Sequence, residues 1–532
     1  MKQHDCDVAI VGAGFAGMHL IYRLRQLGFS VRCFDKASGV GGTWYWNRYP
    51  GARCDIESVQ YSYQFDDALQ QDWNWTERYA TQPEILKYAN HVADRFDLQR
   101  DITFDCGIAS AHYDEAGQCW GLRDATGCLA RARYCIMATG CLSVPNRPEI
   151  KGLERFAGPV YHTGTWPHER IDFTGLRVAV IGTGSSAIQS IPHIARKAAG
   201  LTVFQRTANY AIPAHNGPLD PERLKTIKAG YGDMRARAKT TYGGIDAVYN
   251  TEPALEATPA EREAEYERRW QAGGLTFLGA YGDLMLSKQA NDTAADFVRA
   301  KIRQTVKDPA VADRLCPANI IGGKRLCVDI GYFETYNLDH VSLIDLNQHP
   351  IEEITETAIR AGGKDIAIDC LVIATGFDAM TGALMNIDIR GRGEALLQNK
   401  WANGPIAYLG LAIAGFPNLF TVTGPGSPSV LTNMLPTIEQ HVEWICACLA
   451  AMRERGHTVV EADGKAEAAW TDHVRDISAP ALKSTTGSWY LGSNVPGKPA
   501  VFMPYLGGLP AYIEKCQDVV ANGYEGFSFS AG

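Results

Sequence analysis

Two glycine-rich turns restrict the possible folds of this chain more than any other feature of its sequence. One is Gly-Ala-Gly-Phe-Ala-Gly at residues 12–17, and the other is Gly-Thr-Gly-Ser-Ser-Ala at 182–187. Each follows a short apolar run, at 7–11 and at 176–181. Strand, glycine-rich turn and helix in this order form the βαβ unit that binds a dinucleotide. The chain is therefore predicted to contain two such units.

The first unit has the full pattern of a dinucleotide site that includes an unmodified ribose. Gly12 is expected to make the tight turn, Gly14 to let the backbone approach the pyrophosphate, and Gly17 to let helix and strand pack closely. The next strand-like run, at 30–34, ends in Asp35, which lies 23 residues after Gly12. An acid at this distance is placed to accept a hydrogen bond from a ribose hydroxyl.

The second unit differs at the end of its second strand, where no acid is present. The run at 201–204 leads instead into Gln-Arg-Thr, and Arg206 lies 24 residues after Gly182. The planar guanidinium of an arginine can pair with a 2′-phosphate, so the second site is predicted to prefer NADPH over NADH. The alternative is an arginine that merely lies on the surface. The residues predicted to bind this cofactor are Gly182, Gly184, Ser185, Ser186, Arg206 and Thr207.

The first dinucleotide site has an acid, Asp35, where the second has a cation, Arg206. This difference suggests a bound flavin at one site and an exchanging nicotinamide cofactor at the other. Segments 135–140 and 370–376 are apolar runs that both end in Ala-Thr-Gly, as expected where a chain passes between two binding domains. Between them, residues 213–317 are rich in Ala, Glu, Arg and Lys at helical spacing, and their charge runs are predicted to be solvated. The predicted fold is α/β, with two Rossmann-like domains for FAD and NADP and an inserted helical subdomain. Its predicted bounds are 1–142 and 375–532 for the FAD domain, 151–212 and 318–374 for the NADP domain, and 213–317 for the insertion.

Composition limits the partners and the other cofactors. The 532 residues exceed what one core supports, and 51 Lys plus Arg against 59 Asp plus Glu give a net charge of −8. We therefore expect neither nucleic acid nor a membrane as a partner. No apolar run approaches the ~18 residues of a membrane span, and the start of the sequence has no signal-peptide pattern, so a cytoplasmic location is expected. The 14 cysteines form no C-x-x-C pair, so neither a metal site nor a disulfide reductase is expected.

A third motif, at residues 156–167, carries a family resemblance. The string Phe-Ala-Gly-Pro-Val-Tyr-His-Thr-Gly-Thr-Trp-Pro resembles F-x-G-x-x-x-H-x-x-x-W-P, the fingerprint of type I Baeyer–Villiger monooxygenases. Flavin-containing N- and S-oxygenases have a related string with another aromatic residue near its end. The matching residues are Phe156, Gly158, His162, Trp166 and Pro167.

The resemblance extends over nearly the whole chain. Residues 39–58, 323–326, 424–429 and 488–490 are similar to the same family, and the sequence looks closest to its phenylacetone monooxygenases, followed by its cyclohexanone monooxygenases. What this implies is a reaction in which NADPH reduces FAD, the reduced flavin captures O2 as a C4a-peroxide, and the peroxide anion attacks a ketone to give an ester or lactone.

The resemblance also implies roles for charged residues. Arg325 would stabilise the peroxide anion, and Asp55 would accept from its guanidinium. Lys324 would reach the 2′-phosphate beside Arg206 and Thr207. An arginine suits the first role because it keeps its charge at any working pH. For Asp55, the alternative is an acid that only caps a turn.

Other site residues follow from the same resemblance. Gly42 and Thr43 would lie along FAD, and Trp44 and Trp46 would pack on its isoalloxazine ring. Trp489 would close over the nicotinamide, although simple packing is an equal alternative for this residue. The small or apolar residues that match a ketone pocket are Cys141, Ser429, Val430, Leu431 and Met434.

Several positions depart from the family pattern. Residues 317–323 lack the usual Tyr-Pro and the Thr next to the lysine, Ala500 replaces a usual basic residue, and Ala187 replaces a common glycine. The departures at 317–323 and at Ala500 lie in loops that the resemblance places near the nicotinamide. The resemblance therefore predicts the type of reaction more firmly than it predicts cofactor affinity or substrate range.

Three functions remain open at this point. The leading one is a ketone monooxygenase, the second is an N- or S-oxygenase that uses the same peroxyflavin, and the third is a flavin-binding redox sensor or interaction protein. His162 can be a packed residue between domains or a proton-transfer group.

Overall fold

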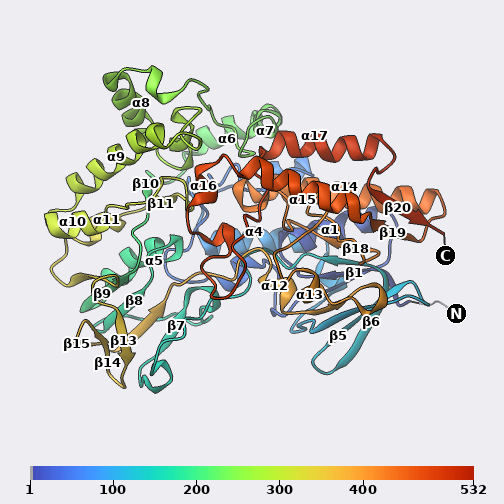
Figure 1. The fold of residues 1–532 in the computed structure, drawn as a ribbon, viewed down its shortest axis with the longest axis horizontal. Coiled ribbons are helices and arrows are strands. Elements are labelled where there is room, and N and C mark those ends of the chain that lie inside the picture. Colours follow the sequence, from blue (N-terminus) through green and yellow to red (C-terminus); the bar gives the residue numbers. More distant parts are fainter. Residues whose placement is uncertain (1–3, 532) are drawn as a thin grey trace.

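The computed structural model describes residues 4–531 and contains two sheets that carry the two βαβ units (Figure 1). The first sheet has the order β17-β4-β5-β6-β1-β2-β3, and β18 pairs with β6. Its central strand β1 lies parallel to both β2 and β6, as a dinucleotide-binding unit requires. Its strands are β1 (Cys6–Val11), β2 (Val31–Phe34), β3 (Ile102–Thr103), β4 (Ser110–Asp114), β5 (Cys119–Asp124), β6 (Gly127–Met137), β17 (Asp388–Arg390) and β18 (Leu419–Thr421).

The second sheet is entirely parallel and has the order β12-β9-β8-β16-β7. Its strands are β7 (Val160–His162), β8 (Arg177–Ile181), β9 (Gly200–Gln205), β12 (Val341–Asp345) and β16 (Cys370–Ile373). Every residue of β16 is buried, as expected for a parallel strand covered on both faces. The prediction of an α/β fold with two dinucleotide-binding units is confirmed.

The first helix of each unit begins inside the glycine-rich motif. Helix α1 (Phe15–Gln26) begins directly after Gly14 and packs against α14 (Met434–Glu454), and α5 (Ser185–Ala195) begins directly after Gly184. The other helices around the two sheets are α2 (Thr43–Trp46), α3 (Asp67–Asp72), α4 (Gln82–Arg95), α11 (Tyr332–Thr335), α12 (Gly382–Met385), α13 (Leu397–Lys400), α15 (Gly464–Ser478), α16 (Leu482–Thr485) and α17 (Gly508–Ala521).

The predicted helical insertion is present between two short parallel strands, β10 (Ala211–Pro213) and β11 (Cys327–Asp329). Its helices are α6 (Pro221–Ala229), α7 (Tyr231–Lys239), α8 (Pro259–Ala272), α9 (Lys288–Thr305) and α10 (Pro309–Leu315). The prediction that its charges are solvated is wrong for Arg269. This side chain is buried, and it donates to the carbonyls of Val248, Thr276 and Gly279, three acceptors that only the folded insertion brings together.

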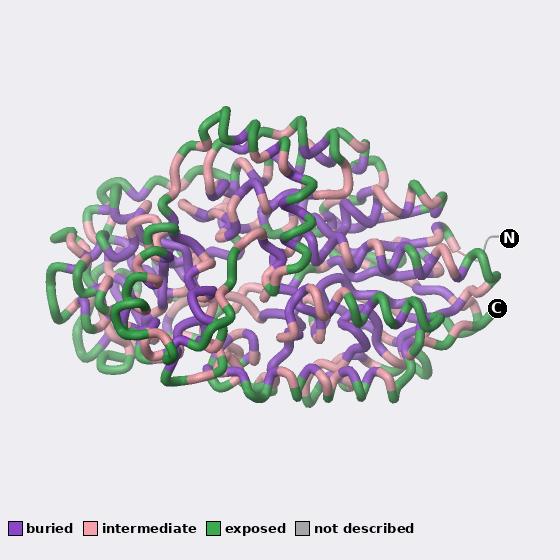
Figure 2. The backbone as a smooth tube through the Cα atoms, turned by 90° about the horizontal axis from the view of Figure 1, so that it is seen from above, coloured by how far each residue is buried: buried purple, intermediate pink, exposed green. Residues whose placement is uncertain are grey.

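The remaining strands form two small antiparallel sheets at the periphery. They are β13 (Ile351–Ile354), β14 (Ala358–Ala361) and β15 (Lys364–Ala367) in one sheet, and β19 (Val459–Ala462) and β20 (Phe527–Ser530) in the other. Figure 2 shows the buried backbone inside and the exposed backbone outside, along the whole length of the molecule. Among residues 4–531, no helix is long and apolar enough to cross a membrane, and no cluster of three or more potential metal ligands occurs.

Candidate cofactor and active site

The first glycine-rich turn has no room for a side chain at Gly12 or Gly17. Gly12 has φ +110°, and a Cβ atom on it would lie 2.4 Å from the carbonyl oxygen of Ala138. A Cβ atom on Gly17 would lie 1.9 Å from the carbonyl oxygen of Gly12. Gly14 and Gly42 face each other, since a Cβ on Gly42 would lie 3.0 Å from the Cα of Gly14. The turn at 12–17 and the loop at 39–42 thus leave a backbone-lined groove of the kind that a pyrophosphate needs.

Asp35 lies at the end of β2 and holds this turn in place. Its two carboxylate oxygens accept hydrogen bonds from the backbone N–H groups of Ala13 and Ala37, at 2.6 and 2.8 Å. Burial raises the pKa of Asp35 even though both hydrogen bonds act in the opposite direction. The expected bond to a ribose hydroxyl stays a prediction, and it would use the remaining lone pairs of the carboxylate.

The aromatic residues after Gly42 have different surroundings. Thr43 begins α2, and the buried Trp44 donates from Nε1 to the hydroxyl of Tyr61 at 3.1 Å. Trp46 is partly exposed and lies under the ammonium of Lys36, 5.2 Å from the ring centre. Their packing on the isoalloxazine ring stays a prediction.

The second glycine-rich turn leaves open space in front of a helix N-terminus. Gly182 has φ +116° and approaches Ala374, whose carbonyl oxygen would lie 2.4 Å from an added Cβ. Gly184 has no atom within 4 Å of its missing Cβ, and Ser185 and Ser186 begin α5 directly after it. Free backbone N–H groups at a helix start favour an anion. This geometry fits the pyrophosphate of a second dinucleotide.

Both glycine-rich turns pack against an alanine of the Ala-Thr-Gly segments. Ala138 follows β6 and Ala374 follows β16, and each provides the backbone that Gly12 or Gly182 approaches. The repeated Ala-Thr-Gly is therefore part of the two binding units, because a small residue is needed where strand and turn come this close.

Two cationic side chains lie together beside the second turn. The first, Arg206, follows β9 and is exposed. The second, Lys324, is partly buried, and burial together with the positive charge of the nearby Arg206 lowers its pKa. Thr183, inside the turn, donates its hydroxyl to the carbonyl of Thr207 at 2.7 Å and so ties the predicted phosphate-binding segment to the turn. Two adjacent cations repel each other in the free protein, so a phosphate between them would relieve this repulsion.

His162 of the fingerprint has backbone partners on both ring nitrogens. Nδ1 accepts from the N–H of Gly164 at 3.0 Å, and Nε2 lies 3.3 Å from the carbonyl oxygen of Asn146, to which it can only donate. Burial lowers the pKa of His162. A neutral ring with both nitrogens engaged favours the structural alternative over proton transfer.

The other fingerprint residues pack around the same connection. Trp166 is buried against Tyr161, with ring centres 5.3 Å apart, and Phe156 is buried on the other face of the second sheet. Gly158 passes β16 so closely that a Cβ would lie 2.4 Å from the carbonyl oxygen of Asp369. Pro167 follows Trp166 in a partly buried loop.

Arg325 and Asp55 form a two-pronged ion pair, although 270 residues separate them in the sequence. Nε and Nη2 of the guanidinium donate to the two carboxylate oxygens at 2.8 and 2.7 Å. Nη1 donates to the carbonyl of Val430 at 2.7 Å. Burial opposes the charge of Arg325, but the carboxylate of Asp55 outweighs it and raises the pKa further. With 24% and 20% of these side chains exposed, the pair remains accessible to small molecules.

The predicted ketone-pocket residues gather in one apolar cluster next to this pair. Cys141 and Val430 are buried members, Leu431 and Met434 pack against them, and the hydroxyl of Ser429 lies 3.9 Å from the sulfur of Met380 in the same cluster. The other members of this cluster are Leu142, Ala379, Trp489, Tyr490, Leu491, Phe502, Met503 and Leu506. Trp489 therefore lies at the predicted pocket, and its closing over a nicotinamide stays a prediction.

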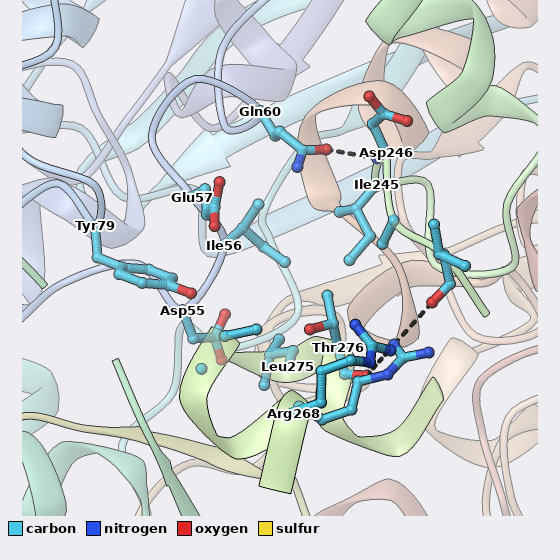
Figure 3. Close-up of a pocket in the computed structure, with 15 residues that line it drawn as sticks. Asp55, Ile56, Glu57, Gln60, Tyr79, Ile245, Asp246, Arg268, Leu275 and Thr276 are labelled. Atoms are coloured by element: carbon cyan, nitrogen blue, oxygen red, sulfur yellow. Dashed lines mark hydrogen bonds between the residues drawn. The ribbon is translucent and has the colours of Figure 1, made fainter. Parts of the chain in front are cut away.

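A cavity of about 240 Å³ lies beside Asp55 (Figure 3). One wall is the segment 55–60 with Tyr79, and the other is the insertion at 245–248 and 268–276. None of the predicted pocket residues lines this cavity, so it is a space distinct from the apolar cluster.

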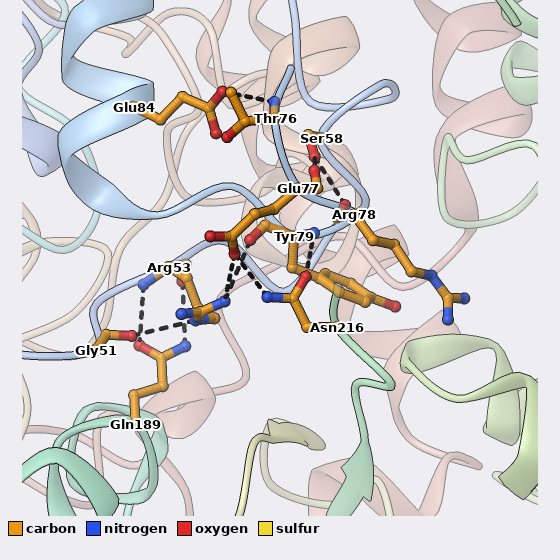
Figure 4. A network of polar contacts seen from close by, with 10 residues as sticks. All are labelled: Gly51, Arg53, Ser58, Thr76, Glu77, Arg78, Tyr79, Glu84, Gln189 and Asn216. Carbon is orange, nitrogen blue, oxygen red and sulfur yellow. Dashed lines mark hydrogen bonds and ion pairs between the residues drawn. The ribbon is translucent and has the colours of Figure 1, made fainter. Parts of the chain in front are cut away.

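The sequence did not indicate a polar network that ties the loop before Asp55 to the second unit (Figure 4). Gln189, on α5, accepts from the hydroxyl of Tyr49 at 2.8 Å and donates to the carbonyl of Arg53 at 3.1 Å. The guanidinium of Arg53 also pairs with Glu77, which accepts from Asn216 as well. The only available signal was a glutamine at a buried position of the helix that follows the second turn.

Comparisons with known proteins agree with this geometry. Residues 9–257, which include both glycine-rich turns, match a family model described as pyridine nucleotide-disulphide oxidoreductase. A Baeyer-Villiger monooxygenase of Pseudooceanicola batsensis is 41% identical over 98% of this chain and 95% of its own length. A phenazine N-monooxygenase of Lysobacter antibioticus is also 41% identical, over 98% of this chain and 96% of its own length.

Solved structures have the same fold over the whole chain. An oxidized steroid monooxygenase bound to NADP has a TM-score of 0.95 and 50% identity, covering 99% of this chain and 100% of its own. A structure described as OTEMO in complex with FAD and NADP has a TM-score of 0.96 and 36% identity, with the same coverage. The predicted family is thus confirmed, and the greater closeness to phenylacetone monooxygenases stays a prediction. The chain belongs to the Baeyer–Villiger monooxygenase family.

Proposed function

We propose that this chain is a flavoprotein monooxygenase that uses FAD, NADPH and O2 to convert cyclic or arylaliphatic ketones into esters or lactones. The observation that carries the proposal is the guanidinium of Arg325, paired with Asp55 and bonded to the carbonyl of Val430. Family membership and the solved relative bound to FAD and NADP support the cofactors and the reaction. Sulfides are a second substrate class under this proposal.

FAD, once bound and reduced by NADPH, supplies the activation of O2, which amino-acid side chains cannot perform. Arg325 supplies a permanent positive charge where negative charge develops during oxygen transfer. Asp55 fixes the plane of the guanidinium through two hydrogen bonds, so the charge does not need to reorient during the reaction. The apolar cluster that includes Val430 excludes water and offers surface to the carbon skeleton of a ketone.

The test of this proposal is product analysis with the purified enzyme. NADPH, ¹⁸O2 in place of air, and either phenylacetone, cyclohexanone or thioanisole would be supplied, with mass spectrometry of the products and a parallel assay of hydrogen peroxide. Esters or lactones that carry one oxygen atom from ¹⁸O2 are expected from the ketones. The proposal would be contradicted if hydrogen peroxide formed and none of the three substrates gave an oxygenated product.

An N- or S-oxygenase is the second candidate, because a relative named as a phenazine N-monooxygenase is as similar in sequence as the Baeyer-Villiger monooxygenase. A phenazine added to the same assay separates the two readings. N-oxide or sulfoxide formation without any ester would favour the second candidate, and it would show that Trp166 does not identify ketone oxidation.

Arg206→Ala is expected to weaken the use of NADPH selectively. Loss of the cation that faces the expected 2′-phosphate should raise the KM for NADPH about 10-fold or more, equivalent to ~1.4 kcal/mol or more, while the KM for NADH stays within about twofold. Steady-state oxidation of both cofactors checks this. An equal rise for NADPH and NADH would show that Arg206 does not recognise the phosphate.

The proposal includes the predicted domain bounds and a cytoplasmic location. The ends of β6 and β16, at Met137 and Ile373, support the two changes of domain placed at 142–151 and at 374–375. The net charge of −8 and the scattered cysteines support a reducing, aqueous compartment.

A further inference from the structure

A lysine that the family resemblance did not indicate lies beside Arg325. Lys483 belongs to the short helix α16, and its ammonium nitrogen donates to the carbonyl of Gly322 at 2.6 Å. The same nitrogen lies 4.7 Å from the ring centre of Tyr490, a buried residue of the apolar cluster. Gly322 is three residues before Arg325, so this hydrogen bond holds the turn that carries the guanidinium.

The contact between α16 and this turn is close at a second point. A Cβ atom on Gly323 would lie 2.4 Å from the hydroxyl oxygen of Thr486, so the backbone of the turn rests directly on the residue after α16. On its other side, the N–H of Leu482 donates to the carbonyl of Met285 in the insertion, at 2.9 Å. The helix α16 is therefore wedged between the insertion and the turn at 320–325.

The rest of the C-terminal segment 482–503 is fastened elsewhere. Lys498 bonds to the carboxylate of Asp378 and, at 2.8 Å, to the carbonyl of Ala379. Asn494 donates to the carbonyl of Phe377 at 2.7 Å. Among the described residues, Lys483 is the lysine of this segment that reaches the turn of Arg325, whereas Lys498 reaches the loop after β16.

We propose that Lys483 is a positioning residue that fixes Arg325 by fastening the turn 320–325 to the C-terminal segment. This inference rests on the proposed function of Arg325. A flexible turn would let the guanidinium leave its place next to Val430, and oxygen transfer would fail although the cofactors still bound.

Burying a lysine next to an arginine destabilises the folded chain. This cost argues that a lysine stands at position 483 for a functional reason. Burial and the nearby Arg325 lower the pKa of Lys483 to about 7. Within the described part of the chain, the groups that face it are Arg325 from the turn, whose positive charge opposes that of the lysine, and Tyr490 from the C-terminal segment, whose ring lies 4.7 Å from the nitrogen. Between about pH 7 and 10, the unfolded chain binds a proton here that the folded chain does not, so stability rises with pH across this window. Lys483→Met is expected to flatten this rise and to fold normally.

The experiment compares FAD-bound wild type with Lys483→Met, Lys483→Arg, Lys498→Met and the exposed control Lys515→Met. Lys483→Met should reduce its flavin with NADPH within about threefold of wild type, lose at least 10-fold in ester formation, and divert the NADPH to hydrogen peroxide. Hydrogen exchange should speed up at 320–326 in Lys483→Met and at 377–379 in Lys498→Met. Lys483→Arg, which keeps an N–H donor for the carbonyl of Gly322, should recover at least half of the coupling, and Lys515→Met should behave as wild type.

The outcomes separate this inference from the proposed function. If wild type makes no ester, the proposed function is wrong. If wild type makes ester and Lys483→Met matches it in coupling and in exchange at 320–326, only the inference on Lys483 is wrong. A Lys483→Arg enzyme no better than Lys483→Met would also overturn it.

Discussion

Replacing Arg325 by alanine is expected to abolish ester formation while NADPH still reduces the flavin. The substitution removes the positive charge next to Val430 and leaves the carboxylate of Asp55 without its partner. Loss of one electrostatic stabiliser of this kind costs about 10²–10³ in rate, and an unpaired carboxylate of the wrong sign adds to the loss. We therefore expect ester formation to fall by at least about 10³-fold, with flavin reduction within about 10-fold of wild type. Stopped-flow reduction and product analysis measure the two steps separately.

Arg325→Lys is the matched control that separates the effect of the positive charge from the effect of the two hydrogen bonds to Asp55. A lysine keeps the charge but cannot donate two parallel hydrogen bonds to Asp55, so an intermediate rate is expected. Thermal unfolding should show a loss of ~2–3 kcal/mol for Arg325→Ala, below the ~3–5 of a fully buried pair because both side chains are partly exposed. Normal ester yield from the alanine variant would remove Arg325 from the mechanism.

The fold could be predicted because its strongest signals are local. The turns at 12–17 and 182–187 require glycine for reasons that are visible within a few residues, namely a positive φ at Gly12 and Gly182 and a close contact with the backbone. The Ala-Thr-Gly segments were recognised as a pair, and the structure supplies the reason, since Ala138 and Ala374 face the two turns.

The site could be predicted only in part, because its contacts join distant segments. The pairing of Arg325 with Asp55 came from the family resemblance, and no spacing rule connects residues 270 positions apart. Lys483 and Gln189 were missed because their main partners are backbone carbonyls, which leave no trace in the sequence. Arg269 was misread for the same reason: its charge run looks solvated until the carbonyls around it are known.

Asp35 shows that a correct motif can still give an incomplete account of a residue. The spacing placed it at the end of β2, as observed, but its two oxygens already hold the turn through Ala13 and Ala37. A motif defines which residue stands near the cofactor, whereas the number of lone pairs left for the ligand depends on the folded loops.

Gly17→Ala is expected to give a colourless protein that does not retain FAD. The added methyl group would lie 1.9 Å from the carbonyl oxygen of Gly12, a distance that only a shift of α1 or of the turn could relieve. Overpacking of this kind costs about 1–3 kcal/mol, and here it also moves the backbone N–H groups that face the pyrophosphate. We expect FAD affinity to fall at least about 100-fold, equivalent to ~3 kcal/mol, as measured by flavin fluorescence on titration of the apoprotein.

The second unit provides the comparison that makes this result interpretable. Ala187 occupies the position that corresponds to Gly17 and is fully buried in α5, so a methyl group is tolerated there. Gly232→Ala, on α7, is the control for the substitution itself, because no atom lies within 4 Å of its missing Cβ and alanine favours a helix by up to ~1 kcal/mol. Gly232→Ala should keep its yellow colour and unfold at the same or a higher temperature. Full FAD retention by Gly17→Ala would mean that the turn at 12–17 is less rigid than its contacts indicate.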